Sequence, residues 1–418
     1  MSEQDRRNEP IVITGMGLVT SLGQDRETVW QAIQAGRSNV RPLSGMRGLP
    51  DGEFFGATVD LPETIPGQLK VIPLCQLAAR EAMQDAAVDL TQVDMSRFGS
   101  AIAGHMGDTR WLGDGISQQA PGGANWWEQF LPHTAGSLVA NEFNLQGPRI
   151  CHSTACASSL VSILSAMRRI RDGQADIMLT GGGDAIDPLF AAGFQRMGVL
   201  GSHPDPNQAC RPFDRSRNGF VMGEGAAMFV VERLSHALAR GATIYAEIVS
   251  GAILAEAHHV TGLDMESKTL VHLIRRTLEK AAVAPEDVGY INAHGTGTKQ
   301  NDLVEMRGIR TALGPAADQV AVSASKSMIG HLVNAAGGVE LAITVLAQRD
   351  GYAPPTINLN DIDPACTFDC VPLTGKKINF EYAIKLSVAF GGHLVGILLR
   401  RWNDGATGFA YPTERRAA

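Results

Sequence analysis

One cysteine lies among small residues at the point where a strand pattern gives way to a helix pattern. Cys156 is flanked by Ala155 and Ala157, and apolar side chains recur at helical spacing over residues 160–170. At a helix start, unpaired backbone N–H groups and the positive end of the helix dipole favour a thiolate over a thiol. Cys156 is therefore a candidate nucleophile, although this stretch alone fits a buried packing cysteine equally well.

Two histidines have comparable positions. His294 ends the apolar run YINA and opens the loop HGTGTKQND, in which Thr296 and Thr298 supply hydroxyl groups. His331 follows KSMIG and is expected to begin the helix LVNAAGGVELAITVLA. One thiol and two imidazoles can carry out acyl transfer, because the sulfur takes an acyl group while the imidazoles stabilise charge on a second substrate.

The remaining cysteines indicate neither a disulfide framework nor a metal site. The six cysteines are dispersed over 418 residues, so all of them are expected to be reduced thiols. Two pairs stand four or five positions apart, which is not the usual zinc spacing, and no histidine pair completes them: Cys151 with Cys156, and Cys366 with Cys370. No metal is expected.

The composition is that of a soluble globular enzyme. The chain is 44% hydrophobic and 19% charged, and its net charge of −7 argues against nucleic-acid binding, which needs clustered Lys and Arg. The start is polar and no apolar run reaches the roughly 18 residues of a membrane-spanning helix. We expect a cytoplasmic location and no membrane contact.

The order of predicted strands and helices occurs twice, beginning near Ile11 (IVITGMGLVTSLG) and near Ile244 (IYAEIVSGAILAEA). Predicted strands such as IMLT and AMFVVE are short continuous apolar runs, as expected where helices cover both faces of a sheet. These patterns predict a layered α/β/α/β/α protein with halves 1–242 and 243–418. No Pro/Ser-rich linker separates the halves, so we expect them to share one core, with the active residues gathered where strand ends meet.

Five segments resemble the elongating β-ketoacyl-acyl carrier protein synthases, nearest to type II. They are TACASS, RPFDRSRNGFVMGEGAA at 211–227, NAHGTGTKQND, SKSMIGHLVNAAGGVE and AFGGH at 389–393. The resemblance runs in order over nearly the whole chain. It implies the thiolase fold, which is a duplicated five-layer α/β/α/β/α arrangement, and a homodimer. A heterodimer stays open as an alternative.

The resemblance also implies a reaction. Cys156 would be acylated by an acyl-carrier thioester, and His294 and His331 would stabilise the enolate formed when malonyl-carrier loses CO2. The carbanion would attack the acyl-cysteine to give a 3-oxoacyl-carrier. No metal or bound cofactor is implied, since the acyl carrier protein supplies phosphopantetheine. The chain length of the acyl group cannot be read from the sequence.

Further site residues follow from the same resemblance. Lys326 and Glu305 would organise a charged site, joined through water or an ion, although a structural ion pair is the plainer interpretation. The remaining roles are an oxyanion hole from the N–H groups of Cys156 and Phe390, a gate of Phe390, Gly391 and Gly392, and pantetheine contacts from Thr261, Thr296 and Thr298.

Two features depart from the family pattern. Leu394 stands where relatives usually carry Asn, so a polar contact that steadies the gate would be missing. The segment 60–77 and His203 provide a weaker basic surface than relatives usually have, which favours a dedicated carrier protein over a housekeeping one.

Other functions fit less well. A degradative thiolase would need a second cysteine in its Gly-rich C-terminal motif, and AFGGHLVG has none. An initiating synthase would replace one histidine by Asn. The alternative that we keep is a noncatalytic or weakly active chain-length partner subunit in a ketosynthase heterodimer. Noncatalytic partners lack the cysteine, whereas Cys156 is present, but a heterodimer stays open.

Overall fold

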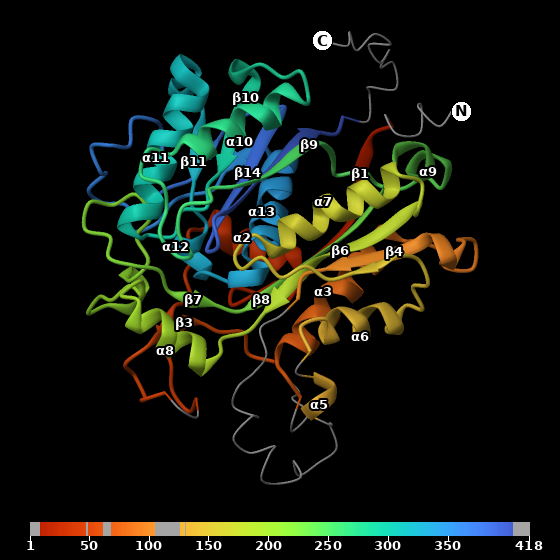
Figure 1. Ribbon diagram of the computed structural model, residues 1–418, viewed down its shortest axis with the longest axis horizontal. Helices are drawn as coiled ribbons and strands as arrows, with labels where there is room; N and C mark the ends of the chain where they lie inside the picture. Colours follow the sequence, from red (N-terminus) through yellow and green to blue (C-terminus); the bar gives the residue numbers. More distant parts are fainter. Residues whose placement is uncertain (1–8, 47–48, 62–67, 105–125, 130, 404–418) are drawn as a thin grey trace.

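A computed structural model describes residues 9–46, 49–61, 68–104, 126–129 and 131–403 (Figure 1). Its main feature is a hydrogen-bonded sheet of ten strands whose two halves repeat one strand order. From edge to centre, each half contains its third, second, fourth, fifth and first strand. In the first half these are β5 (Arg149–Ile150), β4 (Phe98–Ile102), β6 (Ile177–Asp184), β8 (Gly225–Arg233) and β1 (Ile11–Thr20); in the second they are β11 (Ala321–Ser323), β10 (Val288–Asn292), β14 (Tyr382–Ala389), β15 (His393–Arg401) and β9 (Ala246–Ala255).

The repeated order confirms the duplication predicted from the sequence. In both halves the first strand pairs antiparallel with the last, and the three outer strands pair in parallel. The halves meet where Val12 and Ile13 of β1 pair with Glu247 and Ala246 of β9. The expected boundary between residues 242 and 243 falls just before β9 and stays a prediction.

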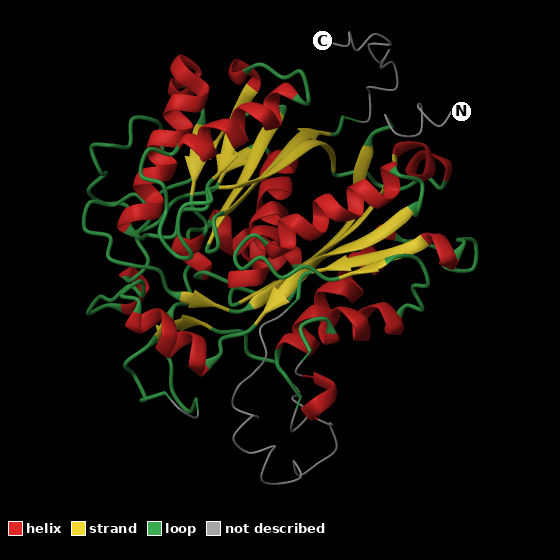
Figure 2. Cartoon of the chain, viewed as in Figure 1, coloured by secondary structure: helices red, strands yellow, loops and turns green. Residues whose placement is uncertain are grey.

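Two buried helices lie between the halves of the sheet. α7 (Ser158–Arg171) contacts β4, β6, β8 and β15, and α13 (Ala336–Asp350) contacts α7, β8 and β14. Close approach of these helices needs Gly337, since a Cβ there would lie 2.6 Å from Leu160 Cγ. Figure 2 shows this helix pair between the two groups of strands.

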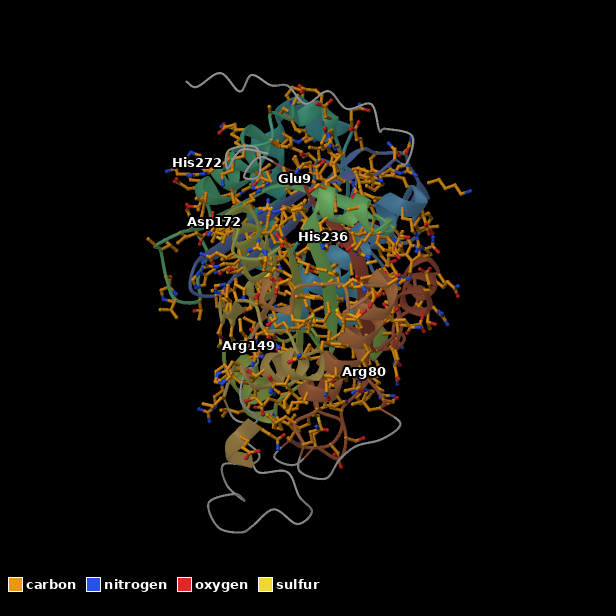
Figure 3. All side chains as sticks on the ribbon, turned by 90° about the vertical axis from the view of Figure 1, so that its right-hand side faces the viewer. Glu9, Arg80, Arg149, Asp172, His236 and His272 are labelled. Carbon is orange, nitrogen blue, oxygen red and sulfur yellow. A yellow bond between two sulfur atoms is a disulfide. The ribbon has the colours of Figure 1, made fainter. Side chains whose placement is uncertain are left out.

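Amphipathic helices cover the outer faces. α3 (Val71–Ala86) and α6 (Thr134–Glu142) cover the first half, and α10 (Lys268–Glu279), with α11 (Lys299–Leu313) packed against it, covers the second. Figure 3 shows the molecule from the side, with His272 of α10 in the upper part and Arg80 of α3 in the lower part. The five-layer thiolase-like architecture expected from the sequence is confirmed.

The pattern of apolar and charged residues along each helix explains in which layer that helix lies. Residues 336–348 of α13 are all buried, which suits a segment that is apolar or small almost all round. In α10 only one face is buried, through Leu270, Leu273, Ile274 and Leu278, and charged residues occupy the other face. A helix between two sheets therefore differs in sequence from a helix that faces solvent.

Among the described residues, no helix combines the length and apolar character needed to cross a bilayer.

Shorter elements complete the described chain. β2, β3 and β7 form one small sheet, and β12 and β13 form another. The bounds are α2 (Arg26–Gln34), α5 (Trp126–Gln129), α8 (Pro188–Arg196), α9 (Leu234–Ala239), α12 (Lys326–Ile329), β2 (Arg41–Pro42), β3 (Phe55–Ala57), β7 (Met222–Gly223), β12 (Tyr352–Ala353) and β13 (Lys376–Lys377).

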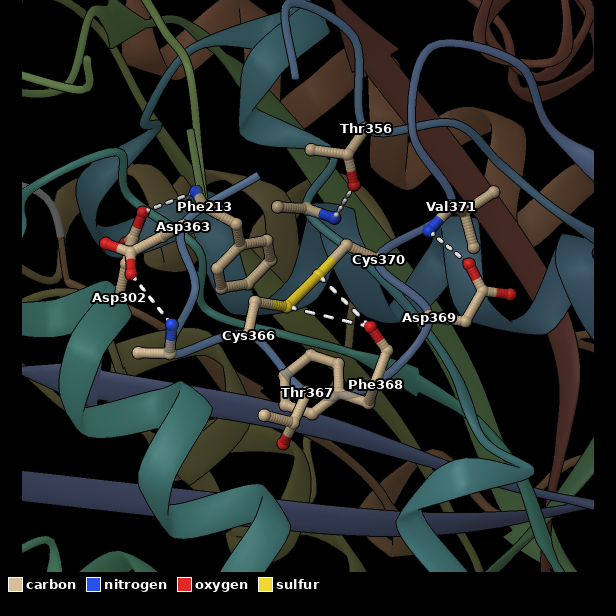
Figure 4. The surroundings of a disulfide bond; sticks show 12 residues. Phe213, Asp302, Thr356, Asp363, Cys366, Thr367, Phe368, Asp369, Cys370 and Val371 are labelled. Atoms are coloured by element: carbon tan, nitrogen blue, oxygen red, sulfur yellow. Dashed lines mark hydrogen bonds between the residues drawn. A yellow bond between two sulfur atoms is a disulfide. The ribbon is translucent and has the colours of Figure 1, made fainter. Parts of the chain in front are cut away.

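The expectation that all six cysteines are thiols is wrong for one pair. Cys366 and Cys370 form a disulfide (Figure 4). The chain between them folds back so that both sulfur atoms lie 3.7 Å from the Phe368 carbonyl oxygen. Sequence spacing could not reveal this reversal of the loop. The other four cysteines are free, and only Cys151 among them is exposed.

Candidate active site

Cys156 lies where the sequence predicted, two residues before the first residue of α7. The turn that presents it is closed by Ser158, whose Oγ accepts a hydrogen bond from the Thr154 N–H at 2.8 Å and donates to the Ala155 carbonyl at 2.7 Å. Ala155 has a φ of +47°, so the chain turns sharply before the nucleophile. Cys156 itself is buried.

His331 faces the thiol, but it does not begin a helix as expected. Its backbone pairs with the strand region of β7: the His331 N–H donates to the Val221 carbonyl at 2.6 Å, and its carbonyl accepts from the Gly223 N–H at 2.9 Å. α13 begins only at Ala336. The bridge places His331 Nε2 2.9 Å from Cys156 Sγ.

His294 follows β10 and lies beside His331. The two rings are nearly perpendicular, with centroids 5.3 Å apart. Glu305 of α11 fixes the loop, because its carboxylate accepts the N–H groups of His294 and Gly295, each at 2.6 Å. Lys326 Nζ lies 3.3 Å from His294 Nδ1. Since an ammonium group only donates, Nδ1 acts as the acceptor and the ring proton of neutral His294 resides on Nε2.

The carboxylate in direct contact with Lys326 is Glu340, which the sequence analysis missed. Glu340 Oε1 lies 2.6 Å from Lys326 Nζ, and Glu340 Oε2 lies 2.8 Å from Nζ of Lys385, a second residue that was missed. All three side chains are buried. The available signal was one acidic residue in the apolar run GGVELAITVLA and one lysine in the apolar strand IKLSVA.

The electrostatic environment differs from the expectation of a thiolate at a helix start. Burial raises the pKa of Cys156 to about 12, although the positive charge of Lys326 acts in the opposite direction. Burial, together with Lys326, holds the pKa values of His294 and His331 well below the usual range. The resting site therefore contains a thiol and two neutral imidazoles at pH 7, and His331 Nε2 is the atom placed to exchange a proton with the thiol.

Seven of the predicted site residues line one cavity of about 740 Å³, whereas four others do not line it: Lys326, Glu305, Gly391 and Gly392. Its wall includes the catalytic candidates Cys156, His294 and His331 together with Phe390, and also the hydroxyl-bearing residues Thr261, Thr296 and Thr298. The hydroxyl groups of Thr296 and Thr298 are 2.9 Å apart. A long thin substrate arm with polar groups along it fits such a lining.

The expected gate is a tight turn bonded to a second loop. Gly391 and Gly392 follow Phe390 with φ values of +84° and +74°, conformations that favour glycine. The Gly391 N–H donates to the Val260 carbonyl at 2.7 Å, so the gate is joined to the loop that carries Thr261. Leu394 is fully buried in the core of the second half, and its packing there, rather than a polar contact, anchors the strand after the gate.

Models of two protein domains match most of the chain. The N-terminal domain of β-ketoacyl synthase matches residues 8–72 and 70–237, and the C-terminal domain matches residues 245–360. The chain belongs to the β-ketoacyl synthase family. It is thus a condensing enzyme of the acyltransferase class, as the sequence predicted.

Curated relatives of this β-ketoacyl synthase come from two kinds of pathway. It is 37% identical to 3-oxoacyl-[acyl-carrier-protein] synthase 2 of Coxiella burnetii, over 94% of this chain and 99% of that protein. It is 34% identical to the tetracenomycin polyketide synthase ketoacyl synthase alpha subunit of Streptomyces glaucescens, over 94% and 97% of the two chains.

Solved structures of similar proteins have the same fold. A type II PKS acyl-carrier protein in complex with its ketosynthase matches with a TM-score of 0.86 at 31% identity, over 95% of this chain and 100% of that chain. A β-ketoacyl synthase from Burkholderia phymatum matches with a TM-score of 0.86 at 30% identity, over 94% and 100% of the two chains.

The same three side chains could in principle hold a metal ion. One ligand atom each of Cys156, His294 and His331 lies within 4.8 Å of the others. The ammonium group of Lys326, hydrogen-bonded to His294, opposes a divalent cation at this place, because like charges repel strongly where water is excluded. The arrangement favours an anion, such as an enolate, over a metal ion.

Proposed function

We propose that this β-ketoacyl synthase elongates acyl chains as a 3-oxoacyl-[acyl-carrier-protein] synthase, with Cys156 as the nucleophile. It would join a Cys156-bound acyl group to a two-carbon unit derived from malonyl-carrier, with loss of CO2. The observation that carries the proposal is the 2.9 Å contact between Cys156 Sγ and His331 Nε2, with His294 in the same cavity.

The first step is transfer of the acyl group to Cys156. The sulfur attacks the thioester carbonyl, and its proton passes by way of His331 Nε2 to the departing carrier thiol. The carbonyl oxygen becomes negative during the attack, and the N–H groups of Cys156 and Phe390 are the proposed donors that stabilise it. A carbon–sulfur bond forms to Cys156 and the equivalent bond to the carrier breaks, so no further reactant is needed.

The second step forms the carbon–carbon bond. The Nε2–H of His294 points away from Lys326 and donates to the thioester oxygen of malonyl-carrier, with His331 as the second stabilising group. Loss of CO2 then leaves an enolate, whose carbon attacks the acyl-cysteine carbonyl. The sulfur of Cys156 leaves and takes up one proton. Lys326 supports this step because its charge favours the anion, and Glu305 fixes the loop that carries His294.

The proposed partner is an acyl carrier protein, loaded in turn with acyl and malonyl groups. Thr261, Thr296 and Thr298 line the cavity and would contact its phosphopantetheine arm, and the enzyme itself needs no bound cofactor. A carrier protein in complex with its ketosynthase among the similar structures supports this choice. The preference for a dedicated carrier stays a prediction; residues 62–67 of the segment invoked for it lie outside the described residues.

We propose a homodimer, with a heterodimer as the alternative. One similar structure is the ishigamide ketosynthase/chain length factor, which supports keeping the alternative. In that case this chain could serve as a noncatalytic partner, but the contact between Cys156 and His331 favours a catalytic role. The mass of the purified complex distinguishes one kind of subunit from two. The cytoplasmic location stays a prediction.

Intact-mass measurement tests the proposal. The protein is incubated with a medium-chain acyl-carrier thioester, and malonyl-carrier is then added. We expect a mass gain of one acyl group that malonyl-carrier discharges into a 3-oxoacyl product. Cys156→Ala should gain no mass, whereas Cys151→Ala, which removes the exposed thiol, should behave as the unchanged protein. If no carrier acylates the unchanged protein, the elongating function is wrong and the partner role takes its place.

A further inference from the structure

Lys385 is a fully buried lysine that none of the proposed steps uses. It lies in the middle of β14, a strand between β10 and β15 in the second half of the sheet. A buried ammonium group is costly unless all its protons find acceptors. Lys385 Nζ donates to the carbonyl oxygens of Ala293 at 3.0 Å, Asn292 at 3.4 Å and Leu386.

Two of these carbonyls belong to the residues that lead directly into His294. β10 ends at Asn292, and Ala293 is the only residue between this strand and the imidazole. Lys385 therefore holds the end of β10 by its backbone. Any displacement of this ammonium group would move the carbonyls that fix the starting point of the His294 loop.

Lys385 also reaches His294 by a second route, through side chains. Its Nζ lies 2.8 Å from Glu340 Oε2, while Glu340 Oε1 lies 2.6 Å from Lys326 Nζ. Lys326 in turn lies 3.3 Å from His294 Nδ1. One carboxylate is thus shared by two ammonium groups, and only one of these touches the imidazole.

We propose that Lys385 is a positioning residue for condensation, which fixes Glu340 and the end of β10 so that Lys326 holds His294 with its Nε2–H toward the substrate. The inference rests on the proposed function for its kinetic consequences. Without Lys385, Glu340 would keep one partner instead of two and could rotate, and the hydrogen bond that selects the His294 tautomer would weaken.

Charge gives Lys385 a second effect in the same direction. Beside the site, Lys326 and Lys385 carry two positive charges and Glu340 carries one negative charge, to which Glu305 adds a second as it ionises near pH 7. The positive charge of Lys385 contributes to the low pKa of both histidines. Among the described residues, the ionisable groups that interact with Lys385 include Glu340 of α13, Lys326 of α12 and Glu305 of α11, together with the imidazoles of His294 and His331. Loss of CO2 moves the negative charge of the malonyl group from its carboxylate to the thioester oxygen, and positive charge close to that oxygen favours this transfer.

The state of Lys385 depends on pH within the working range of an enzyme. Burial lowers its pKa to about 8, although Glu340 acts in the opposite direction. The ammonium form is present below that pH and is lost above it. We therefore expect the rate of condensation to fall as pH rises through about 8, while acylation of Cys156 follows a different pH profile.

The test compares Lys385→Met, a substitution of similar length, with the exposed control Lys377→Met. In Lys385→Met we expect kcat for condensation to fall about tenfold, since one supporting electrostatic contact is lost, and the alkaline decline near pH 8 to disappear. Acylation of Cys156 should stay within about twofold of the unchanged protein. Thermal unfolding of both variants checks that they fold. If Lys385→Met does not fold, Lys385→Gln replaces it, because the glutamine amide keeps a donor for the Ala293 carbonyl.

A second readout needs no catalytic turnover. Nitrogen-15 chemical shifts of labelled histidine, assigned with His294→Asn, report the tautomer of His294 directly. The unchanged protein should show the proton on Nε2, and the Lys385 variant should show a mixture of tautomers. An unchanged tautomer together with an unchanged pH profile would overturn the proposal. If the unchanged protein makes no 3-oxoacyl product, the proposed function fails, yet the histidine spectra still decide the role of Lys385.

Discussion

The two halves of the molecule share one topology but surround the site with opposite environments. In the first half, residues 158–167 of α7 and 177–183 of β6 carry no charged side chain, and Asp184, which ends β6, is a buried carboxyl whose pKa burial raises to about 7. In the second half, the corresponding α13 and β14 carry Glu340 and Lys385, both fully buried. The nucleophile comes from the neutral half, and both imidazoles come from the charged half.

This difference separates two chemical demands. Burial keeps the sulfur of Cys156 protonated until a thioester is bound, and the carboxyl of Asp184 acts in the same direction. A charged surrounding stabilises the anion that forms when malonyl-carrier loses CO2. The two halves thus share one strand order, and the buried charged residues of the second half distinguish its chemical role from that of the first.

The largest predicted effect comes from removing the nucleophile of the neutral half. Cys156→Ala should lower condensation at least about 1000-fold, because no acyl-enzyme can form. Cys156→Gln should also abolish condensation but keep decarboxylation of malonyl-carrier, which depends on the charged half. Product analysis by mass spectrometry separates the two reactions. Condensation at the normal rate in Cys156→Gln would remove Cys156 from the mechanism.

Removing an imidazole of the charged half should affect the second step selectively. His294→Ala should lower condensation by about 100- to 1000-fold, as expected for loss of one donor to a developing oxyanion. Its Cys156 should still be acylated, whereas His331→Ala should slow both steps because His331 contacts the sulfur. Rapid-quench measurement of each step makes the comparison, with His272→Ala on exposed α10 as the control. Equal effects of both variants on acylation would contradict this division.

A smaller effect is expected from a substitution in the turn that follows Phe390, the proposed gate. Gly391→Ala introduces a side chain at a φ of +84°, where its Cβ would lie 3.1 Å from the His393 ring. The strain should change the gate position and slow turnover roughly fivefold. Gly173→Ala, at a similar φ of +73° with open space around it, is the matched control. In steady-state kinetics, kcat should fall for Gly391→Ala but not for Gly173→Ala. The free energy of unfolding should fall by a similar amount in both variants.

The smallest effect concerns stability and Glu305, the carboxyl that fixes the His294 loop. Burial raises its pKa to about 7, above the ordinary value of 4.5. The folded protein thus keeps this proton at a higher pH than the unfolded chain, and stability should decline as pH rises from about 4.5 to 7. Over this pH range, Glu305→Gln should reduce the loss of unfolding free energy by about 3 kcal/mol.

Urea unfolding at a series of pH values measures this slope. Glu279→Gln on the exposed face of α10 should leave it unchanged. A slope in Glu305→Gln as steep as that of the unchanged protein would show that Glu305 ionises normally. If the stability of Glu305→Gln still declines in part over this pH range, Asp184, whose pKa burial also raises to about 7, would account for the remaining decline.

Features carried by local sequence could be predicted before the structure was seen. The duplication, the turn at Cys156 and the loop at His294 all follow from runs of apolar, small and glycine residues. Cys156, His294 and His331 were predicted from their residue types and positions, whereas Phe390 and Thr261 of the same cavity were found through the family resemblance. The start of α13 was misplaced because His331 itself forms the bridge to β7 and the four residues after it, which include the short turn Val333–Ala335, precede the helix.

Features that depend on tertiary burial could not be predicted. A helix start favours a thiolate, yet full burial of Cys156 outweighs that effect and raises its pKa. Glu340 and Lys385 each stand alone in an apolar run, and only the packing of α13 against β14 brings them together. The disulfide between Cys366 and Cys370 likewise depends on how the loop folds back.

The position of β1 has a consequence for synthesis of the chain on the ribosome. β1 emerges first, but its partners on either side are β8, which ends at Arg233, and the start of β9 at Ala246 and Glu247. Until those residues are made, both edges of an apolar strand lack their final partners. Contacts of such long sequence separation form slowly. Nascent chains shorter than about residue 250 should therefore be the ones that need a chaperone to prevent aggregation.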